Sequence, residues 1–259
     1  MTYPDDFINK VIQGDCLDVM KQMPDKCVDL VVTSPPYDGL RDYHGYSFDF
    51  EGVARELWRV IKDGGVVVWV VGDATVDGSE SGTSFRQALF FKEVGFNLHD
   101  TMIYLKKDFP PLSHNRYEQQ FEYMFVLSSG KPKTFNGLRD SSKYAGELRN
   151  KKNNKYEKGS AIRNRVGYTT IKDTKMRTNV WLMSVAHTKL NHPAIFPEKL
   201  AQDHIISWSN EGDIVLDPFN GSGTTTKSAK QLGRNFIGIE LSEKYCEIAR
   251  QRLRQDTLL

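Results

Sequence analysis

Residues 213–225 read DIVLDPFNGSGTT. The apolar run before Asp217 predicts a buried strand, the two glycines predict a tight turn, and the threonines after them begin a helix. Such a turn lets a ligand approach the free N–H groups of the helix N-terminus, which favour a carboxylate or another anion. Two acids strengthen this weak motif: Asp217 ends its strand, and Glu240 ends the next predicted strand 23 residues later, near the spacing of a ribose-binding acid. Together they predict a nucleoside site.

Strand-like runs alternate with helical patterns through most of the chain, which is typical of a parallel α/β sheet covered by helices on both faces. We expect strands at 11–13, 29–32, 66–71, 101–105, 121–127, 214–216 and 235–239. We expect helices at 17–22, 50–61, 84–94, 197–209, 224–232 and 242–254. The predicted fold is a doubly wound, Rossmann-like sheet whose nucleotide-binding half comes at the C-terminal end of the chain.

The formal net charge of +2 conceals an uneven distribution of charge. Residues 131–190 hold 15 Lys and Arg against 4 Asp and Glu, so this stretch carries +11 and the remainder −9. A basic insert suits a polyanion-binding enzyme, because each cation that neutralises a phosphate releases a counterion. The alternative is a solvated loop. We therefore divide the chain into a body, 1–130 with 191–259, and a basic insert, 131–190.

The composition excludes several classes of protein. With 259 residues, 39% of them hydrophobic and 26% charged, the chain is neither collagen-like nor wholly disordered. It has no apolar stretch of membrane-spanning length and no signal peptide, so we expect a cytoplasmic protein without a membrane partner. The cysteines lie in no CxxC or Cys/His spacing and the histidines are scattered, so neither a disulfide framework nor a metal site is predicted.

A phosphate-binding loop is the rival interpretation of the glycine turn. Residues 221–228, GSGTTTKS, fall one residue short of the G-x-x-x-x-G-K-[ST] pattern. Thr226 stands at the second glycine, where a β-branched residue suits the phosphate-wrapping backbone poorly, and Asp217 would bring a carboxylate to the phosphates. An ATPase or GTPase is therefore disfavoured.

A second motif, TSPPY, occupies residues 33–37 at the end of a predicted buried strand. Consecutive prolines lack backbone donors and hold the chain extended, which leaves carbonyl oxygens as fixed acceptors. With the hydroxyl of Ser34 and the ring of Tyr37, these acceptors suit an exocyclic amino group on a stacked base. Such contacts pull the amine toward a geometry that can attack a sulfonium methyl held in line. An ordinary proline-stiffened loop is the alternative.

The two motifs together resemble those of the S-adenosylmethionine-dependent DNA amino-methyltransferases, with [DNS]-P-P-[YFW] as catalytic motif and D-P-F-x-G-S-G as cofactor motif. The resemblance spans nearly all of the chain outside the insert, and its order is that of the family's beta group. It implies a methyltransferase sheet with circularly permuted order, S-adenosylmethionine as cofactor and double-stranded DNA as substrate. The implied catalytic residues are Ser34, Pro35, Pro36 and Tyr37. The implied cofactor-binding residues are Asp15, Cys16, Phe196, Asp217, Phe219, Asn220, Gly221, Ser222, Gly223, Thr224, Thr225 and Glu240.

The resemblance also implies direct transfer of a methyl group to a flipped base, with no covalent enzyme intermediate. Transfer to carbon 5 of cytosine is excluded, because in that class of enzyme the cysteine nucleophile follows a proline and no cysteine here does. Ser34 resembles the residue of enzymes that act on cytosine N4, whereas those that act on adenine N6 more often carry Asp or Asn. Both bases stay open, with cytosine favoured. A catalytically inactive DNA-binding homologue is the remaining alternative.

The resemblance also implies that the basic insert is the family's target-recognition region. Arg163, Arg165 and Arg177 are candidates for guanine contacts, while phosphate contacts are expected for most of its other cations. A bacterial cytoplasm, or a phage gene expressed in a bacterial host, fits this activity. A homodimer and a cognate restriction endonuclease are further expected partners that the residues themselves do not identify.

Overall fold

A computed structural model describes residues 1–36, 49–108, 116–152, 166–185 and 196–255 of the chain. The chain divides into two compact units: unit 1, Met1–Asn136 with Asn179–Leu259, and unit 2, Gly137–Thr178. The excess of basic residues sets the boundaries of the insert at 131 and 190, whereas the division of the fold into compact units sets those of unit 2 at 137 and 178. No helix in the described ranges combines the length and the apolarity needed to cross a membrane.

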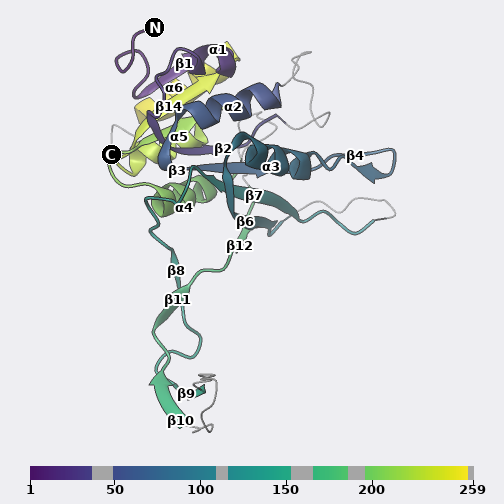
Figure 1. Ribbon diagram of the computed structural model, residues 1–259, viewed down its shortest axis with the longest axis vertical. Coiled ribbons are helices and arrows are strands. Elements are labelled where there is room, and N and C mark those ends of the chain that lie inside the picture. Colours follow the sequence, from purple (N-terminus) through teal and green to yellow (C-terminus); the bar gives the residue numbers. More distant parts are fainter. Residues whose placement is uncertain (37–48, 109–115, 153–165, 186–195, 256–259) are drawn as a thin grey trace. The chain divides into compact units, whose positions relative to one another are not determined.

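An eight-stranded sheet forms the centre of unit 1 (Figure 1). Its order is β1 (Lys10–Gln13), β14 (Asn235–Glu240), β13 (Ile214–Asp217), β2 (Val28–Thr33), β3 (Ile61–Val71), β7 (Phe121–Ser128), β6 (Asn97–Lys106) and β12 (Val180–Met183). Neighbouring strands are parallel except β7, which runs antiparallel to both β3 and β6. This is the doubly wound, Rossmann-like sheet expected from the sequence, with β13 and β14 last among its strands.

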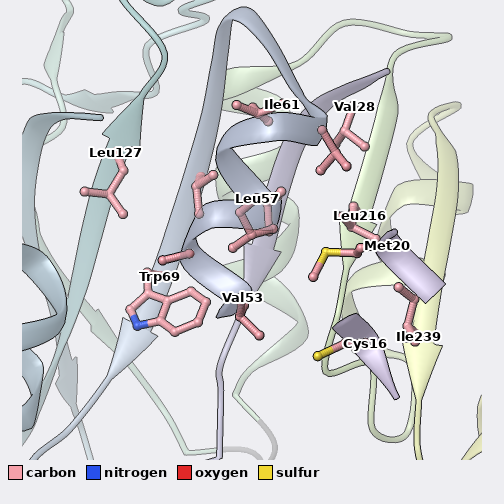
Figure 2. Packing of buried hydrophobic residues seen from close by; sticks show 14 of the residues in the cluster. Cys16, Met20, Val28, Val53, Leu57, Ile61, Trp69, Leu127, Leu216 and Ile239 are labelled. Carbon is pink, nitrogen blue, oxygen red and sulfur yellow. The ribbon is translucent and has the colours of Figure 1, made fainter. Parts of the chain in front are cut away.

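Helices cover both faces of this sheet. The helices are α1 (Cys16–Met20), α2 (Phe50–Val60), α3 (Thr83–Val94), α4 (Glu198–Trp208), α5 (Thr224–Gln231) and α6 (Glu243–Gln255). The first three share one hydrophobic cluster with inward residues of the strands; Leu57 of α2, Trp69 of β3 and Leu216 of β13 all belong to it (Figure 2). Val68 and Val70, which alternate with Trp69 along β3, are equally buried on the opposite face. Burial on both faces explains why β3 is an almost continuous apolar run.

Three strand features escaped the sequence patterns. β7 is antiparallel, and side-chain periodicity is the same for both strand directions. The expected loop after β3 contains a hairpin of β4 (Thr75–Val76) and β5 (Ser79–Glu80), turned by Asp77 and Gly78 with positive φ angles, which an Asp-Gly pair favours. β12 lies within the range assigned to the insert, yet it pairs with β6 at the edge of the main sheet.

Unit 2 is built from two antiparallel ladders. β8 (Arg139–Ser141) pairs with β11 (Thr174–Met176), and β9 (Leu148–Lys152) pairs with β10 (Val166–Thr170). Most of its described side chains are exposed, including Leu148 and Tyr168. The unit is thus a two-stranded ribbon with little apolar core.

His204 of α4 is buried beneath the sheet of unit 1. Its Nε2 lies 3.3 Å from the sulfur of Met124, and its ring centroid lies 4.5 Å from that of Trp181. Its Nδ1 is buried and has no hydrogen-bond partner among the described residues. Burial lowers the pKa of His204 to about 3, so the ring is neutral in the folded protein near pH 7.

Acid should therefore destabilise the wild-type protein more than a His204→Leu variant. The unfolded chain binds a proton at His204 near pH 6.5, whereas the folded chain resists it until about pH 3, so stability is lost as pH falls below 6.5. We expect the difference in unfolding free energy between the two proteins to change by about 3 kcal/mol from pH 7 to pH 4. Urea unfolding at several pH values measures it. The other titrating groups are the same in both proteins, and the packing change caused by leucine is the same at every pH. A difference in unfolding free energy that stays constant with pH would therefore contradict the prediction.

Candidate active site

The carboxyl ends of the neighbouring parallel strands β1, β14, β13 and β2 lie along one edge of the sheet in unit 1. β14 ends at Glu240, β13 at Asp217 and β2 at Thr33, while Asp15 follows β1 after one glycine. Ligands bind at this edge in doubly wound sheets. The cofactor motif and the segment Ser34–Pro36 of the catalytic motif therefore begin side by side at the ligand-binding edge.

The glycine turn, residues 218–223, connects β13 to α5. The N–H of Asn220 donates to the Ile239 carbonyl at 2.9 Å, and the N–H of Gly223 donates to the Asn220 carbonyl at 2.8 Å. Gly223 caps α5 with a φ of +83°, and a Cβ there would lie 2.9 Å from the Cβ of Ala249 on α6. The position needs glycine both for its backbone conformation and for the close approach of α6.

Asn220 is held against β14 where that strand carries Gly238, whose added Cβ would lie 2.7 Å from the Asn220 Cγ. Its Oδ1 accepts a hydrogen bond from the Thr226 hydroxyl at 2.9 Å. Its Nδ2 is buried without a hydrogen-bond partner among the described residues. A buried amide donor without a partner is costly, which makes Nδ2 a candidate donor to a bound ligand.

Asp217 is a buried carboxyl at the junction of the two motifs. Its Oδ1 accepts hydrogen bonds from the Thr33 hydroxyl at 2.6 Å and from the Phe219 N–H at 3.1 Å. Burial raises the pKa of Asp217 to about 6, although both hydrogen bonds act to lower it. The carboxylate thus holds the strand end of one motif and the turn of the other, and it is ionised near pH 7.

Glu240 is half-buried at the end of β14. Its Oε2 accepts from the N–H of Gly221 and its Oε1 from that of Ser242, both at 2.8 Å. Burial raises the pKa of Glu240 above its ordinary value, and these two backbone donors oppose the shift. A carboxylate offers about four acceptor positions. Glu240 therefore keeps capacity for a hydroxyl pair such as that of a ribose.

Asp15 and Cys16 lie beside Glu240, because Gln13 on β1 is in register with Glu240 on β14. The Asp15 carboxylate caps α1 by accepting from the N–H of Leu17 at 2.8 Å. The Cys16 thiol belongs to the hydrophobic cluster, and burial raises its pKa to about 12. Any contact of Cys16 with a ligand would therefore come from its main chain.

An ionic cluster that sequence patterns did not reveal supports the glycine turn. Arg252 of α6 donates through Nη1 to the Ser222 carbonyl at 2.7 Å and to its hydroxyl at 3.2 Å, and through Nη2 to Glu198 of α4 at 2.6 Å. Lys227 donates to the same oxygen of Glu198 at 3.0 Å. Although burial acts to raise it, these partners hold the pKa of Glu198 below its ordinary value. In the sequence, Arg252 is one of several basic residues on an amphipathic helix, so nothing local marks it.

Among the remaining residues of the predicted cofactor site, Phe219, Thr224 and Thr225 follow β13 at the same edge. Phe219 is half-buried, with its ring centroid 6.2 Å from that of Trp69. Thr224 and Thr225 begin α5 and are buried, and the Thr225 hydroxyl donates to the Val32 carbonyl at 3.0 Å. Phe196 is half-buried and precedes Pro197, the N-cap of α4. The first turn of α5 carries no acidic residue, which leaves its positive end available to an anion.

Three predicted residues lie outside the described residues: Tyr37, Arg163 and Arg165. Ser34 is half-buried and Pro35 is buried directly after β2. Arg177 lies in unit 2, where its Nε donates to the Asp140 carboxylate at 2.9 Å. Its guanidinium is thus already paired with an acid within the ribbon.

Comparison with known proteins identifies the class. The family model for N6 and N4 methyltransferases, described as DNA methylase, matches residues 28–251, and the chain belongs to this family. The orphan methyltransferase M.BamHII of Bacillus amyloliquefaciens is 54% identical over 250 residues, which cover 93% of this chain and 94% of that protein.

Two solved structures share the fold. TTHA0409 of Thermus thermophilus, in complex with S-adenosyl-L-methionine, matches with a TM-score of 0.64 and 26% identity over 95% of each chain. The cytosine-N4-specific PvuII DNA methyltransferase matches with a TM-score of 0.70 and 21% identity, over 93% of this chain and 85% of that one. The protein is a DNA methyltransferase whose cofactor is S-adenosylmethionine.

The residues at the sheet edge fit this cofactor chemically. The positive end of α5 and the buried Asn220 Nδ2 suit its carboxylate end, because both offer hydrogen-bond donors. The acceptor capacity of Glu240 suits the ribose hydroxyls. The turn after β1 lies on the side of Glu240 that faces away from β13. Burial raises the pKa of all three cysteine thiols, which agrees with transfer that uses no cysteine nucleophile.

Proposed function

We propose that this enzyme methylates the N4 amino group of a cytosine flipped out of double-stranded DNA. The observation that carries the proposal is the position of Ser34 and Pro35, which follow β2 directly at the strand end that Thr33 ties to the cofactor turn. An acceptor at this point can hold the target amine next to the methyl donor. The serine itself is the feature that favours cytosine, through the resemblance of its motif.

The catalytic segment acts by hydrogen bonding and positioning. The Ser34 hydroxyl and a carbonyl of the proline segment accept the two N–H groups of the exocyclic amine, and Tyr37 stacks on the base. S-adenosylmethionine supplies an electrophilic methyl group on its sulfonium. With the cofactor bound, a nitrogen–carbon bond would form as its carbon–sulfur bond breaks, and the methylated amine would release its surplus proton to solvent. Because that amine is acidic, no strongly basic side chain is required.

The cofactor-binding role is proposed for the residues gathered along the sheet edge. They are Asp15, Cys16, Phe196, Asp217, Phe219, Asn220, Gly221, Ser222, Gly223, Thr224, Thr225 and Glu240. Asp217 acts through the turn that it holds, and Cys16 acts through its main chain.

The DNA-binding role is proposed for the basic insert. Unit 2 carries 12 Lys and Arg against 4 Asp and Glu, and a two-stranded antiparallel ribbon is a shape that the major groove admits. Arg163, Arg165 and Arg177 remain the candidates for base contacts, and Arg177 would have to exchange Asp140 for a base. We further propose a bacterial cytoplasm as the compartment, because the substrate is DNA and M.BamHII is a bacterial protein. A homodimer and a partner endonuclease remain predictions.

Adenine N6 is the second candidate target, because an aspartate and a serine both need only to accept one hydrogen bond from the amine. A homologue that binds DNA without catalysis is disfavoured by the intact pairing of the cofactor turn with β2 and β14.

Nucleoside analysis separates these possibilities. The purified enzyme is incubated with unmethylated DNA and methyl-deuterated S-adenosylmethionine, and the digested nucleosides are identified by mass spectrometry. We expect deuterated N4-methylcytosine. Labelled N6-methyladenine instead would overturn the cytosine assignment and retain the class of reaction. Absence of any labelled nucleoside, with cofactor binding intact, would favour the inactive homologue. Ser34→Ala is the matched control and should give far less of the same labelled nucleoside when both proteins are assayed within the initial-rate period.

A further inference from the structure

Two buried hydroxyls join the catalytic motif to the cofactor motif. β13 and β2 pair in parallel through Val215 with Leu30 and Leu216 with Val31. Beyond these pairs, the Thr33 hydroxyl of β2 donates to Asp217 Oδ1 at 2.6 Å. The Thr225 hydroxyl of α5 donates to the Val32 carbonyl at 3.0 Å. One link therefore runs from the end of β2 to the cofactor turn, and the other runs from the start of α5 back to β2.

These links are made where solvent cannot compete. Thr33 and Thr225 are fully buried, and Asp217 is 3% exposed. The oxygen of Asp217 that accepts from Thr33 also accepts from the N–H of Phe219. A single carboxylate oxygen is thus bonded both to the residue before Ser34 and to the turn that faces the cofactor. Hydrogen bonds to a buried ionised group are among the strong ones, because the charge has no water to replace a lost donor.

We propose that Thr33 is a positioning residue, which sets the separation between the Ser34–Pro36 segment and the cofactor turn. This rests on the assignment of that segment as catalytic. Methyl transfer requires the two reacting atoms to be held in line at about 3–3.5 Å, and one partner is bound by each motif. Thr33 touches neither of them, so it acts through the placement of Ser34 and Asp217.

Thr33→Val tests the proposal, because valine keeps the branched shape that β2 packs and removes only the donor. We expect the single-turnover rate of methyl transfer to fall about tenfold to a hundredfold, while the dissociation constant for S-adenosylmethionine changes less than about threefold. The Thr33 hydrogen bond lowers the pKa of Asp217, so this pKa should rise when the donor is lost. If ionised Asp217 is needed to hold the turn, the fall of the transfer rate at acid pH should then begin at a higher pH. Thr33→Ser, which keeps the hydroxyl, should restore both the rate and the profile.

Ser207→Ala is the matched control. Its hydroxyl is also buried and donates to the Asp203 carbonyl at 2.7 Å, within α4 and away from both motifs. We expect some loss of stability in this variant with an unchanged rate. If Thr33→Val behaved like Ser207→Ala, with a lower unfolding midpoint but a wild-type rate and pH profile, Thr33 would be merely structural and the proposal overturned.

Two further measurements keep this test separate from the proposed function. Incorporation of tritium from labelled S-adenosylmethionine counts methyl groups on either base, so adenine as product would overturn the cytosine assignment and leave the test of Thr33 valid. A double-mutant cycle of Thr33→Val with Asp217→Ala, which removes the donor and the acceptor respectively, measures this hydrogen bond without turnover. Additive effects of the two substitutions on unfolding would contradict the coupling that the 2.6 Å hydrogen bond implies.

Discussion

The Ser34→Ala enzyme is expected to bind S-adenosylmethionine as tightly as the wild type and to transfer methyl groups about a hundredfold more slowly. The hydroxyl is proposed to accept a hydrogen bond that strengthens as the amine becomes pyramidal, and loss of one such contact in a preorganised site costs about 10²–10³ in rate. In this proposal the Ser34 hydroxyl contacts the target amine and not the cofactor, so cofactor binding needs no Ser34 contact. Calorimetry without DNA and single-turnover kinetics with DNA measure the two effects separately.

Two companion variants sharpen this test. Ser34→Asn keeps an acceptor at the same place and should retain more activity than Ser34→Ala. Ser128→Ala removes a buried hydroxyl that donates to the Gly130 carbonyl at 2.8 Å, at the end of the β3–β7 ladder where Ser128 pairs with Val66 and away from the carboxyl end of β3. It should leave the rate unchanged. Equal losses of cofactor affinity and rate in Ser34→Ala would show that Ser34 shapes the cofactor site instead of holding the amine.

The sequence could predict what depends on neighbouring residues. The apolar runs that became β2, β3, β13 and β14, and the glycine turn between β13 and α5, are local patterns, and the structure contains them all. The Asp77-Gly78 hairpin was also a local signal, but it stood inside a stretch assigned as a loop. Most of the sheet and its ligand-binding edge were therefore accessible without coordinates.

What the sequence could not predict are contacts between distant segments. Thr33 and Asp217 are 184 residues apart, and only the strand order, which places β13 beside β2, brings them together. Arg252 and Ser222 meet because α6 packs against α5. For Cys16 the resemblance implied a cofactor contact, but only the structure shows that its thiol is buried in the core. The positioning contacts of this site are set by topology, whereas its motifs are set by local sequence.

Gly223→Ala is expected to have a large effect on both stability and cofactor affinity. A Cβ at this position would lie 2.9 Å from the Cβ of Ala249 and 3.1 Å from the Thr226 hydroxyl, so α6 and the start of α5 must move apart. The φ of +83° adds the cost of a left-handed conformation, about 1–2 kcal/mol, and the steric overlap adds about 1–3 kcal/mol. Displacement of α5 also moves the N–H groups proposed to meet the carboxylate of the cofactor.

Gly212→Ala separates the two causes, because Gly212 has nearly the same φ, +84°, with no atom within 4 Å of its added Cβ. It should lose only the conformational term and bind S-adenosylmethionine like the wild type, whereas Gly223→Ala should bind it more than about tenfold more weakly. Urea unfolding and calorimetry measure both quantities. Equal unfolding free energies and equal affinities for the two variants would mean that α6 can shift to make room for the added methyl group at little cost in free energy. The glycine would then be required for its backbone angle alone, and the packing of α6 against the turn would not control cofactor binding.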